Sequence, residues 1–313
     1  MIKVNNKNSY LTKREIIQKD FKRNKALYAM FIPIALYFIL FKYVPMFGIA
    51  IAFQDFTPYQ GVFNSEWVGF YNFERFFNSP YFSTLLINTL KISFSTLLFT
   101  FPAPIILALL LNEMKNRRYA KVVQSILYMP HFISIIVVIG MLKSFTMDTG
   151  IINTLFEFFG FERVSMLNHK EYFIPLYVSS ALWQELGWGT IVYLSALTGI
   201  DMELYEAAKI DGANRWRQTL SITLPSIIPT IVTLLILRVG SILNVGFEKI
   251  ILMYNDNTSP VAEVISSYVY KKGLLEQDWS YSSAVGIFNA VINLVLLTVT
   301  NYISKKTTET GLW

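Results

Sequence analysis

Six long apolar stretches divide the 313-residue chain. Each is at least about 20 residues long, which is the length that a helix needs to cross the hydrocarbon core of a bilayer. The stretches do not alternate apolar and polar residues as membrane strands do, and only helices and closed barrels satisfy their backbone groups in lipid. The sequence therefore predicts six transmembrane helices, at Ala26–Phe53, Tyr81–Leu111, Val122–Phe145, Tyr172–Ile200, Ile222–Gly246 and Ser282–Ile303.

Basic residues are concentrated in every second connecting segment. The segments 1–25, 112–121, 201–220 and 304–313 hold 17 Lys and Arg residues, whereas the segments 54–80, 146–171 and 247–281 hold six. Because positive residues stay on the cytoplasmic side of a membrane, this difference predicts that both termini lie in the cytoplasm. The predicted organisation is a basic segment at 1–25 that contacts membrane lipid, a membrane domain at 26–303 with a cytoplasmic loop at about 200–225, and a tail at 304–313.

The composition agrees with a membrane protein. Charged residues make up 15% of the chain, against about 25% in soluble domains. The net charge of +6 then reflects topology, and nucleic acid is not an expected partner because basic residues do not interleave with stacking aromatics. Cysteine is absent, which excludes disulfides and a cysteine nucleophile. The sequence also has no Gly-x-x-x-x-Gly-Lys-Ser/Thr loop for ATP phosphates. With only two histidines, His131 and His169, a zinc site would need most of its ligands from carboxylates, and we expect this chain to bind no metal and no cofactor.

The segment 199–225 has the pattern of a short cytoplasmic helix. Asp201 can cap its beginning, and Glu203 and Glu206 lie where the helix dipole favours acidic side chains. Gly212 stands where a left-handed residue ends a helix. These signals predict a helix of about three turns in this loop.

One side of this predicted helix is suited to close contact with another surface. Leu204, Ala207, Ala208 and Asp211 are spaced three or four residues apart and therefore share a face. The two alanines carry small side chains, so a second protein surface can approach the helix backbone. Trp216 then marks the membrane interface where the chain re-enters the bilayer.

The same residues resemble the EAA loop of ABC importer permeases. The match consists of Glu206-Ala207-Ala208, three residues, Gly212, nine residues, and then Ile222, Leu224 and Pro225. Further segments are similar to the carbohydrate-uptake branch of that family, namely Ile210–Ala213, Asn88–Leu90, Met129–Pro130 and Gly150–Asn153. As a whole, the chain resembles the subgroup that imports oligosaccharides released from complex polysaccharides, including acidic ones.

The resemblance implies an all-α, polytopic fold of the type I ABC importer permease class in the bacterial plasma membrane. In that family, the EAA helix is a coupling helix that docks on a cytoplasmic ATPase. Carried over to this chain, the coupling residues are Glu203, Glu206, Ala207, Ala208, Asp211 and Gly212. The implied partners are a second permease subunit, two copies of an ATPase that binds ATP and Mg²⁺, an extracellular solute-binding protein and a carbohydrate substrate. This chain would then be a transport subunit and no enzyme.

Polar side chains at membrane depth mark the candidate substrate site, because burying them in lipid is costly. Sugars need hydrogen-bonding groups for their hydroxyls and flat aromatic faces for their C–H sides. The fourth and later spans offer both in Trp183, Gln184, Glu185, Trp188, Tyr193, Asn244, Glu248, Asn289 and Asn293. The alternative is that the aromatics pack against neighbouring helices and that the polar groups form ordinary interhelical hydrogen bonds.

Cations at membrane depth leave a similar choice open. Lys91, Lys143 and Arg238 can attract a uronate carboxylate, pair with intramembrane carboxylates or extend toward the interface. Extension toward the interface is favoured for Lys143, which lies near the end of a span. His131 follows a proline and is interpreted as a packing residue. The aromatic segment 54–80 either helps to receive the external binding protein or forms an interfacial aromatic belt.

Two other classes of protein are weaker alternatives. An ion-coupled secondary transporter could use Glu185, but it has no use for an EAA loop, and six spans would have to pair to form the usual two halves. An intramembrane hydrolase needs a glycine-flanked serine within reach of a histidine. Neither His131 nor His169 occurs with such a serine motif.

Overall fold

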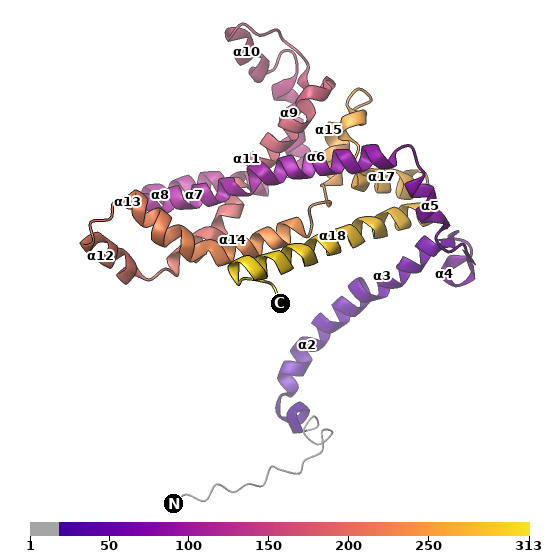
Figure 1. The fold of residues 1–313 in the computed structure, drawn as a ribbon. Helices are drawn as coiled ribbons and strands as arrows, with labels where there is room; N and C mark the ends of the chain where they lie inside the picture. Colours follow the sequence, from indigo (N-terminus) through magenta and orange to yellow (C-terminus); the bar gives the residue numbers. More distant parts are fainter. Residues whose placement is uncertain (1–18) are drawn as a thin grey trace, which may run out of the picture.

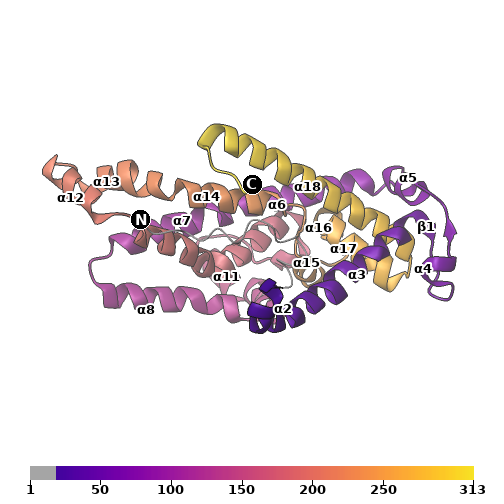
Figure 2. The same cartoon turned by 90° about the horizontal axis from the view of Figure 1, so that it is seen from below.

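The computed structural model describes residues 19–313, and most of this part of the chain is helical. Long helices lie side by side in an elongated bundle, as both views show (Figures 1 and 2). The helices of the bundle are α6 (Phe82–Thr100), α7 (Pro102–Glu113), α8 (Arg117–Tyr128), α11 (Lys170–Thr198), α14 (Leu224–Val239) and α18 (Trp279–Thr308). The basic segment expected at 1–25 lies outside the described residues up to position 18.

The two ends of the bundle carry different connections. α12 (Met202–Ile210), α13 (Arg215–Gln218) and the turn between α7 and α8 lie at one end (Figures 1 and 2). At the other end, β1 (Gln54–Asp55) pairs antiparallel with β2 (Glu66–Trp67), next to α4 (Gly61–Asn64) and α5 (Tyr71–Phe77). The segment 54–80 thus lies at the end of the bundle opposite to the segments 112–121 and 201–220, as expected from the count of basic residues. The small hairpin is the one β element in the described residues.

Five helical stretches are long and apolar enough to cross a membrane, namely Lys25–Phe53, Phe82–Glu113, Ile135–Phe158, Arg215–Val239 and Trp279–Thr308. They confirm the expected all-helical membrane class. The predicted fourth span corresponds to α11, which has 29 residues and is therefore long enough to cross, but it is more polar than the others. The count of six spans stays a prediction.

The third span was predicted at the wrong place. Instead of one helix over Val122–Phe145, the chain forms α8, a 3₁₀ turn η3 (Met129–Phe132) and α9 (Ile135–Thr146), and α9 leaves the bundle at a steep angle (Figure 1). Pro130 lies in the turn and lacks the backbone donor that a continuous helix needs. The apolar stretch that can cross here continues through α10 (Ile151–Phe158).

The fifth span also differs from the expected Ile222–Gly246. Its helix begins at Arg215 with α13, passes through a π-helical turn η5 (Thr219–Thr223) and ends with α14 at Val239. Residues 240–246 form turns that lead to α15 (Phe247–Met253). The hydropathy pattern continues through these turns, so it could not mark the end of the helix.

Most of the first span stands apart from the bundle (Figure 1), whereas its last part, residues 47–53, packs against α18. It comprises α2 (Lys25–Phe38), a π-helical turn η1 (Ile39–Tyr43), α3 (Val44–Met46) and a 3₁₀ segment η2 (Phe47–Phe53). α2 contains no buried residue, and its exposed side chains are largely apolar. Such a surface is expected of a helix surrounded by lipid or by another membrane subunit.

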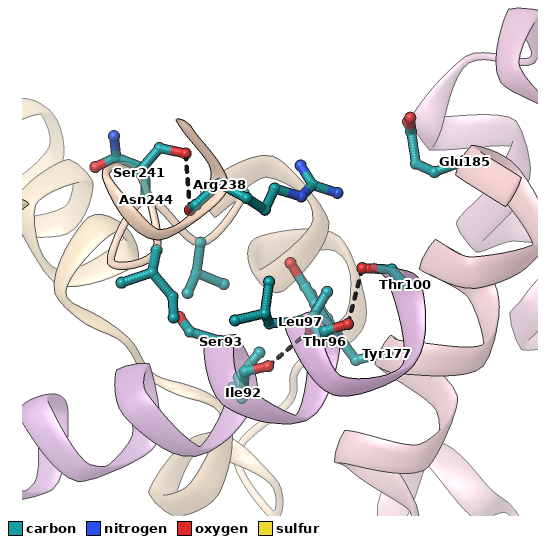
Figure 3. Close-up of a pocket in the computed structure, with 13 residues that line it drawn as sticks. Ile92, Ser93, Thr96, Leu97, Thr100, Tyr177, Glu185, Arg238, Ser241 and Asn244 are labelled. Atoms are coloured by element: carbon teal, nitrogen blue, oxygen red, sulfur yellow. Dashed lines mark hydrogen bonds between the residues drawn. The ribbon is translucent and has the colours of Figure 1, made fainter. Parts of the chain in front are cut away.

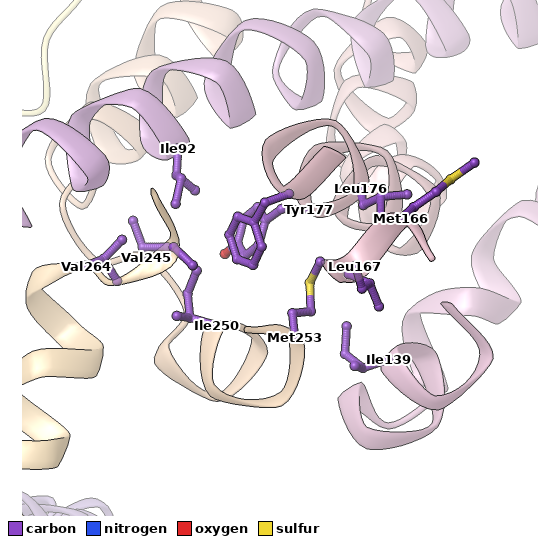
Figure 4. Close-up of a cluster of buried hydrophobic side chains, with 12 residues drawn as sticks. Ile92, Ile139, Met166, Leu167, Leu176, Tyr177, Val245, Ile250, Met253 and Val264 are labelled. Atoms are coloured by element: carbon purple, nitrogen blue, oxygen red, sulfur yellow. The ribbon is translucent and has the colours of Figure 1, made fainter. Parts of the chain in front are cut away.

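The largest buried cluster lies where α6, α9, α11 and α15 meet (Figure 4). It includes Ile92, Ile139, Phe173, Tyr177 and Ile250. Short elements complete this region, namely η4 (Met166–Asn168), α16 (Ser259–Ala262), α17 (Ile265–Tyr270) and the π-helical η6 (Lys271–Leu275). The cluster packs α15 against the first two turns of α11 and so positions the side chains of the candidate site.

Candidate functional site

A cavity of about 430 Å³ lies between α6, α11 and the end of α14. Its polar lining consists of Ser93, Thr96, Thr100, Tyr177, Glu185, Arg238, Ser241 and Asn244. Arg238 extends from α14 toward the side where Glu185 lies (Figure 3), and within residues 19–313 the two form no ion pair closer than 4.0 Å. The cavity therefore presents separated charges of both signs together with hydroxyl groups.

The hydroxyl groups come from one face of α6. Thr96 Oγ1 donates to the carbonyl of Ile92 at 2.7 Å, and Thr100 Oγ1 donates to that of Thr96 at 2.8 Å. These bonds use the donors, so the oxygens remain able to accept. Ser93 Oγ is buried without a hydrogen-bond partner, and such an atom in a cavity indicates a place for a polar ligand.

A second cavity of about 330 Å³ adjoins the first. Both are lined by Tyr177, Glu185 and Gly246. The second is also lined by Gln184, Glu248 and Lys249. Glu185, one of the candidate site residues from the sequence, therefore lies at the junction of the two cavities.

The two tryptophans near Glu185 in the sequence line neither of these cavities. Trp188 stacks on His131, with ring centroids 4.4 Å apart and an interplanar angle of 2°. Trp183 lines a separate cavity against α9. Glu185 and Trp188 are three residues apart and share a face of α11, where both approach His131, whereas Trp183 projects from another face. Neither tryptophan lines the two cavities at Glu185, and the contact of these rings with sugar stays a prediction.

His131 and Gln184 make contacts between α11 and the segment that contains η3 and Ile133. His131 Nδ1 lies 3.4 Å from Glu185 Oε1, although the geometry is not that of a hydrogen bond. Gln184 Nε2 donates at 2.9 Å to the carbonyl of Ile133, which lies just after the break between η3 and α9. The packing role expected of His131 agrees with its stacking on Trp188.

Tyr193 is a core residue in this structure. It is buried in a cluster with Ala108, Leu197 and Ile227, between α7, α11 and α14. It lines neither cavity at Glu185, and its contact with sugar stays a prediction. The Tyr193 side chain points from α11 toward neighbouring helices. The periodicity of the sequence alone does not reveal this direction.

The three asparagines form one network. Asn289 Nδ2 and Asn293 Nδ2 donate to Asn244 Oδ1 at 2.9 and 3.0 Å. Asn293 Oδ1 accepts from the backbone N–H of Leu243 at 3.1 Å. The network attaches α18 to the turn after α14. This arrangement corresponds to ordinary interhelical hydrogen bonding, which was the alternative to a contact of these asparagines with sugar. Asn244 nevertheless lines the first cavity.

Among the three cations noted in the sequence, Arg238 lines a cavity, whereas Lys91 and Lys143 are exposed and line neither cavity. Lys249 is a cation that the sequence analysis missed. The feature of the sequence that could have indicated a buried cation is a single lysine within the mainly apolar segment Phe247–Met253. Burial lowers the pKa of Lys249 to about 7, and the negative charge of Glu185 opposes part of that decrease.

The predicted short helix is present as α12. The Asp201 side chain accepts from the backbone N–H of Glu203 at 3.0 Å, and Gly212 has a φ of +76°. Both features confirm the expected helix signals. Glu206, Ala207 and Asp211 are exposed, and Ala208 is partly exposed, so the face is available for contact. Its coupling role stays a prediction.

α12 is attached to the beginning of the fifth span. Tyr205 Oη lies 2.9 Å from Thr223 Oγ1 in η5, within hydrogen-bond distance. Gln218 Nε2 donates to the carbonyl of Ala213 at 2.7 Å. α13 is in turn connected to α7, because Arg215 pairs with Glu113 at 3.1 Å. A displacement of α12 would therefore act on the helices that carry the cavity.

Comparison with known proteins places these features in a family. The model of the family described as "Binding-protein-dependent transport system inner membrane component" matches residues 101–309. The polygalacturonan/rhamnogalacturonan transport system permease protein YteP of Bacillus subtilis is 48% identical over 292 residues, which cover 93% of this chain and 91% of that protein. That relative is named as a transport permease, in agreement with the expectation that this chain is no enzyme.

Two solved structures are also similar to this chain. One is a bacterial ABC transporter involved in the import of the acidic polysaccharide alginate, with a TM-score of 0.87 and 44% identity over 94% of this chain and 100% of that chain. The other is a bacterial alginate ABC transporter in complex with an alginate pentasaccharide-bound periplasmic protein, with a TM-score of 0.86 and 44% identity over 94% of this chain and 99% of that chain. The chain therefore belongs to the family of inner-membrane components of binding-protein-dependent transport systems.

Proposed function

We propose that this chain is one permease subunit of an ATP-driven importer that brings an acidic oligosaccharide into the bacterial cytoplasm by alternating access. Its partners are a second permease subunit, two copies of an ATPase and an extracellular solute-binding protein. The observation that carries the proposal is the pairing of an exposed, glycine-ended α12 with a charged cavity in the same bundle. Both termini lie in the cytoplasm in this arrangement, as the count of basic residues predicts.

The route from the ATPase to the substrate runs through the fifth span. Glu206, Ala207 and Ala208 would contact the ATPase on α12, and Tyr205 joins α12 to η5. The helix continues as α14 to Arg238, which lines the cavity. π-Helical turns such as η5 are frequent at functional sites. Closure of the ATPase dimer would thus shift the wall of the cavity and change the side from which it is open.

The acidic character of the substrate is supported by two observations. The similar permease YteP is named for polygalacturonan and rhamnogalacturonan, and the similar solved transporter is described as importing the acidic polysaccharide alginate. The cavity of this chain carries Arg238, whose guanidinium matches the geometry of a carboxylate. Ser93, Thr96 and Thr100 supply oxygens for sugar hydroxyls in the same cavity.

The substrate class can be tested with the reconstituted complex of this chain, its partner permease, its ATPase and its binding protein. We expect uronate-containing oligosaccharides to stimulate ATP hydrolysis at least tenfold more than neutral oligosaccharides of the same length. The control is the complex with substrate but without binding protein, which should stay near its unstimulated rate. Equal stimulation by neutral oligosaccharides would refute the acidic substrate.

A further inference from the structure

Lys249 is a buried cation without a buried counter-charge. It is 7% exposed and lines the second cavity. Within residues 19–313 it forms no ion pair closer than 4.0 Å. Burying an ammonium group without a carboxylate partner is costly, and charged groups in the interior of membrane proteins mark functional positions.

The surroundings hold the ammonium group in place and leave part of it free. Its Nζ donates to the carbonyl of Tyr177 at 2.9 Å and lies 4.4 Å from the centroid of the Tyr177 ring. An ammonium group has three donors, and one is used by this carbonyl. The remaining donors can bind an anionic oxygen, and the fixed position lowers the entropic cost of binding.

The two carboxylates that line the same cavity form no ion pair with this lysine within 4.0 Å in the described residues, although the charge of Glu185 acts on it from a greater distance. Glu185 Oε1 lies 3.4 Å from His131 Nδ1. Glu248 is exposed to solvent, which screens its charge. Glu185 also lines the first cavity, where Arg238 lies. Each of the two cavities that Glu185 lines thus also has a basic residue in its lining, Arg238 in the first and Lys249 in the second.

We propose that Lys249 binds a carboxylate of the substrate in the second cavity, beside its junction with the first, and that it thereby selects acidic over neutral oligosaccharides. The proposal rests on the proposed function of this chain as an importer of acidic oligosaccharides. It assigns a second cation, besides Arg238, to the recognition of uronate groups. A charge-assisted hydrogen bond of this kind accounts for about a tenfold or larger difference in affinity.

The test is equilibrium binding, measured by calorimetry on the detergent-solubilised permease–ATPase complex. The ligands are a uronate pentasaccharide and the same pentasaccharide with its carboxyl groups reduced. We expect the unmodified complex to bind the uronate form at least tenfold more tightly. Lys249→Met and Lys249→Gln should reduce this ratio to about one to two. The glutamine variant keeps a donor for the Tyr177 carbonyl, so it separates charge from packing.

The matched control is Lys143→Met, which removes an exposed lysine of α9 that lines neither cavity and should leave the ratio unchanged. If the Lys249 variants keep the preference for uronate, the proposal is wrong. An equal loss of affinity for both pentasaccharides would also overturn it, because it would show a structural role. If the unmodified complex binds both pentasaccharides equally well, the proposed function as an importer of acidic oligosaccharides is refuted. This result differs from the one that refutes only the role of Lys249, in which the unmodified complex prefers the uronate form and the variants keep that preference.

Discussion

Gly212→Asp and Glu206→Lys are each expected to reduce substrate-stimulated ATP hydrolysis by the importer complex at least tenfold. Gly212 ends α12 with a φ of +76°, a conformation that costs other residues about 1–2 kcal/mol. Aspartate adopts this conformation more readily than most residues, but its negative charge would lie at the C-terminal end of α12, where the helix dipole disfavours an anion. Glu206 is exposed on the predicted docking face, and a lysine there would place the opposite charge against the ATPase. Both variants should still insert into the membrane.

The measurement is ATP hydrolysis by each purified complex with and without loaded binding protein, together with the amount of ATPase that copurifies. Glu309→Lys is the matched charge reversal, because Glu309 is exposed at the end of α18, away from α12, and should have little effect. Full stimulation in both α12 variants would show that this helix does not couple the permease to the ATPase.

Gly187→Ala is expected to destabilise the permease by about 1–3 kcal/mol or more, which is the range for overpacked interiors. A Cβ atom at Gly187 would lie 2.1 Å from the carbonyl oxygen of Leu127 and 2.4 Å from its carbonyl carbon. Because these are backbone atoms of α8, they cannot move away as a flexible side chain can. We therefore expect a lower apparent Tm and a smaller yield of folded complex.

Gly140→Ala is the matched control for this prediction. Gly140 lies inside α9, where an added Cβ meets no atom of the described residues within 4 Å. Alanine in a helix interior is more favourable than glycine by about 0.5–1 kcal/mol, so the apparent Tm should stay equal or rise. If the two variants have the same Tm, the close approach of α8 and α11 is not a constraint on this fold.

Most of the fold could be predicted because lipid makes hydropathy a strong signal. The stretches Lys25–Phe53, Phe82–Glu113 and Trp279–Thr308 lie within a few residues of the expected spans. The third span could not be placed correctly because α8 is amphipathic and yet continues into an apolar run. Pro130 was visible in the sequence, but a proline can kink a helix or end it, and tertiary contacts decide which occurs.

The candidate site was only partly predictable. The signals for α12 are local, because capping by Asp201 and the left-handed turn at Gly212 depend on neighbours in the sequence. The direction of side chains on α11 depends on how the helix packs, and the sequence could not separate Glu185 at the cavities from Tyr193 in the core. Lys249 was missed because its partner, the carbonyl of Tyr177, is 72 residues away.

The central claim is that ATP hydrolysis by a partner drives transport through this chain. It is tested most directly by uptake of a labelled uronate oligosaccharide into proteoliposomes that contain the complete complex. We expect uptake to require both ATP on the ATPase side and the binding protein on the other side, and to be unaffected when ionophores remove ion gradients. Uptake that follows an imposed ion gradient without ATP would contradict this claim and indicate a secondary transporter.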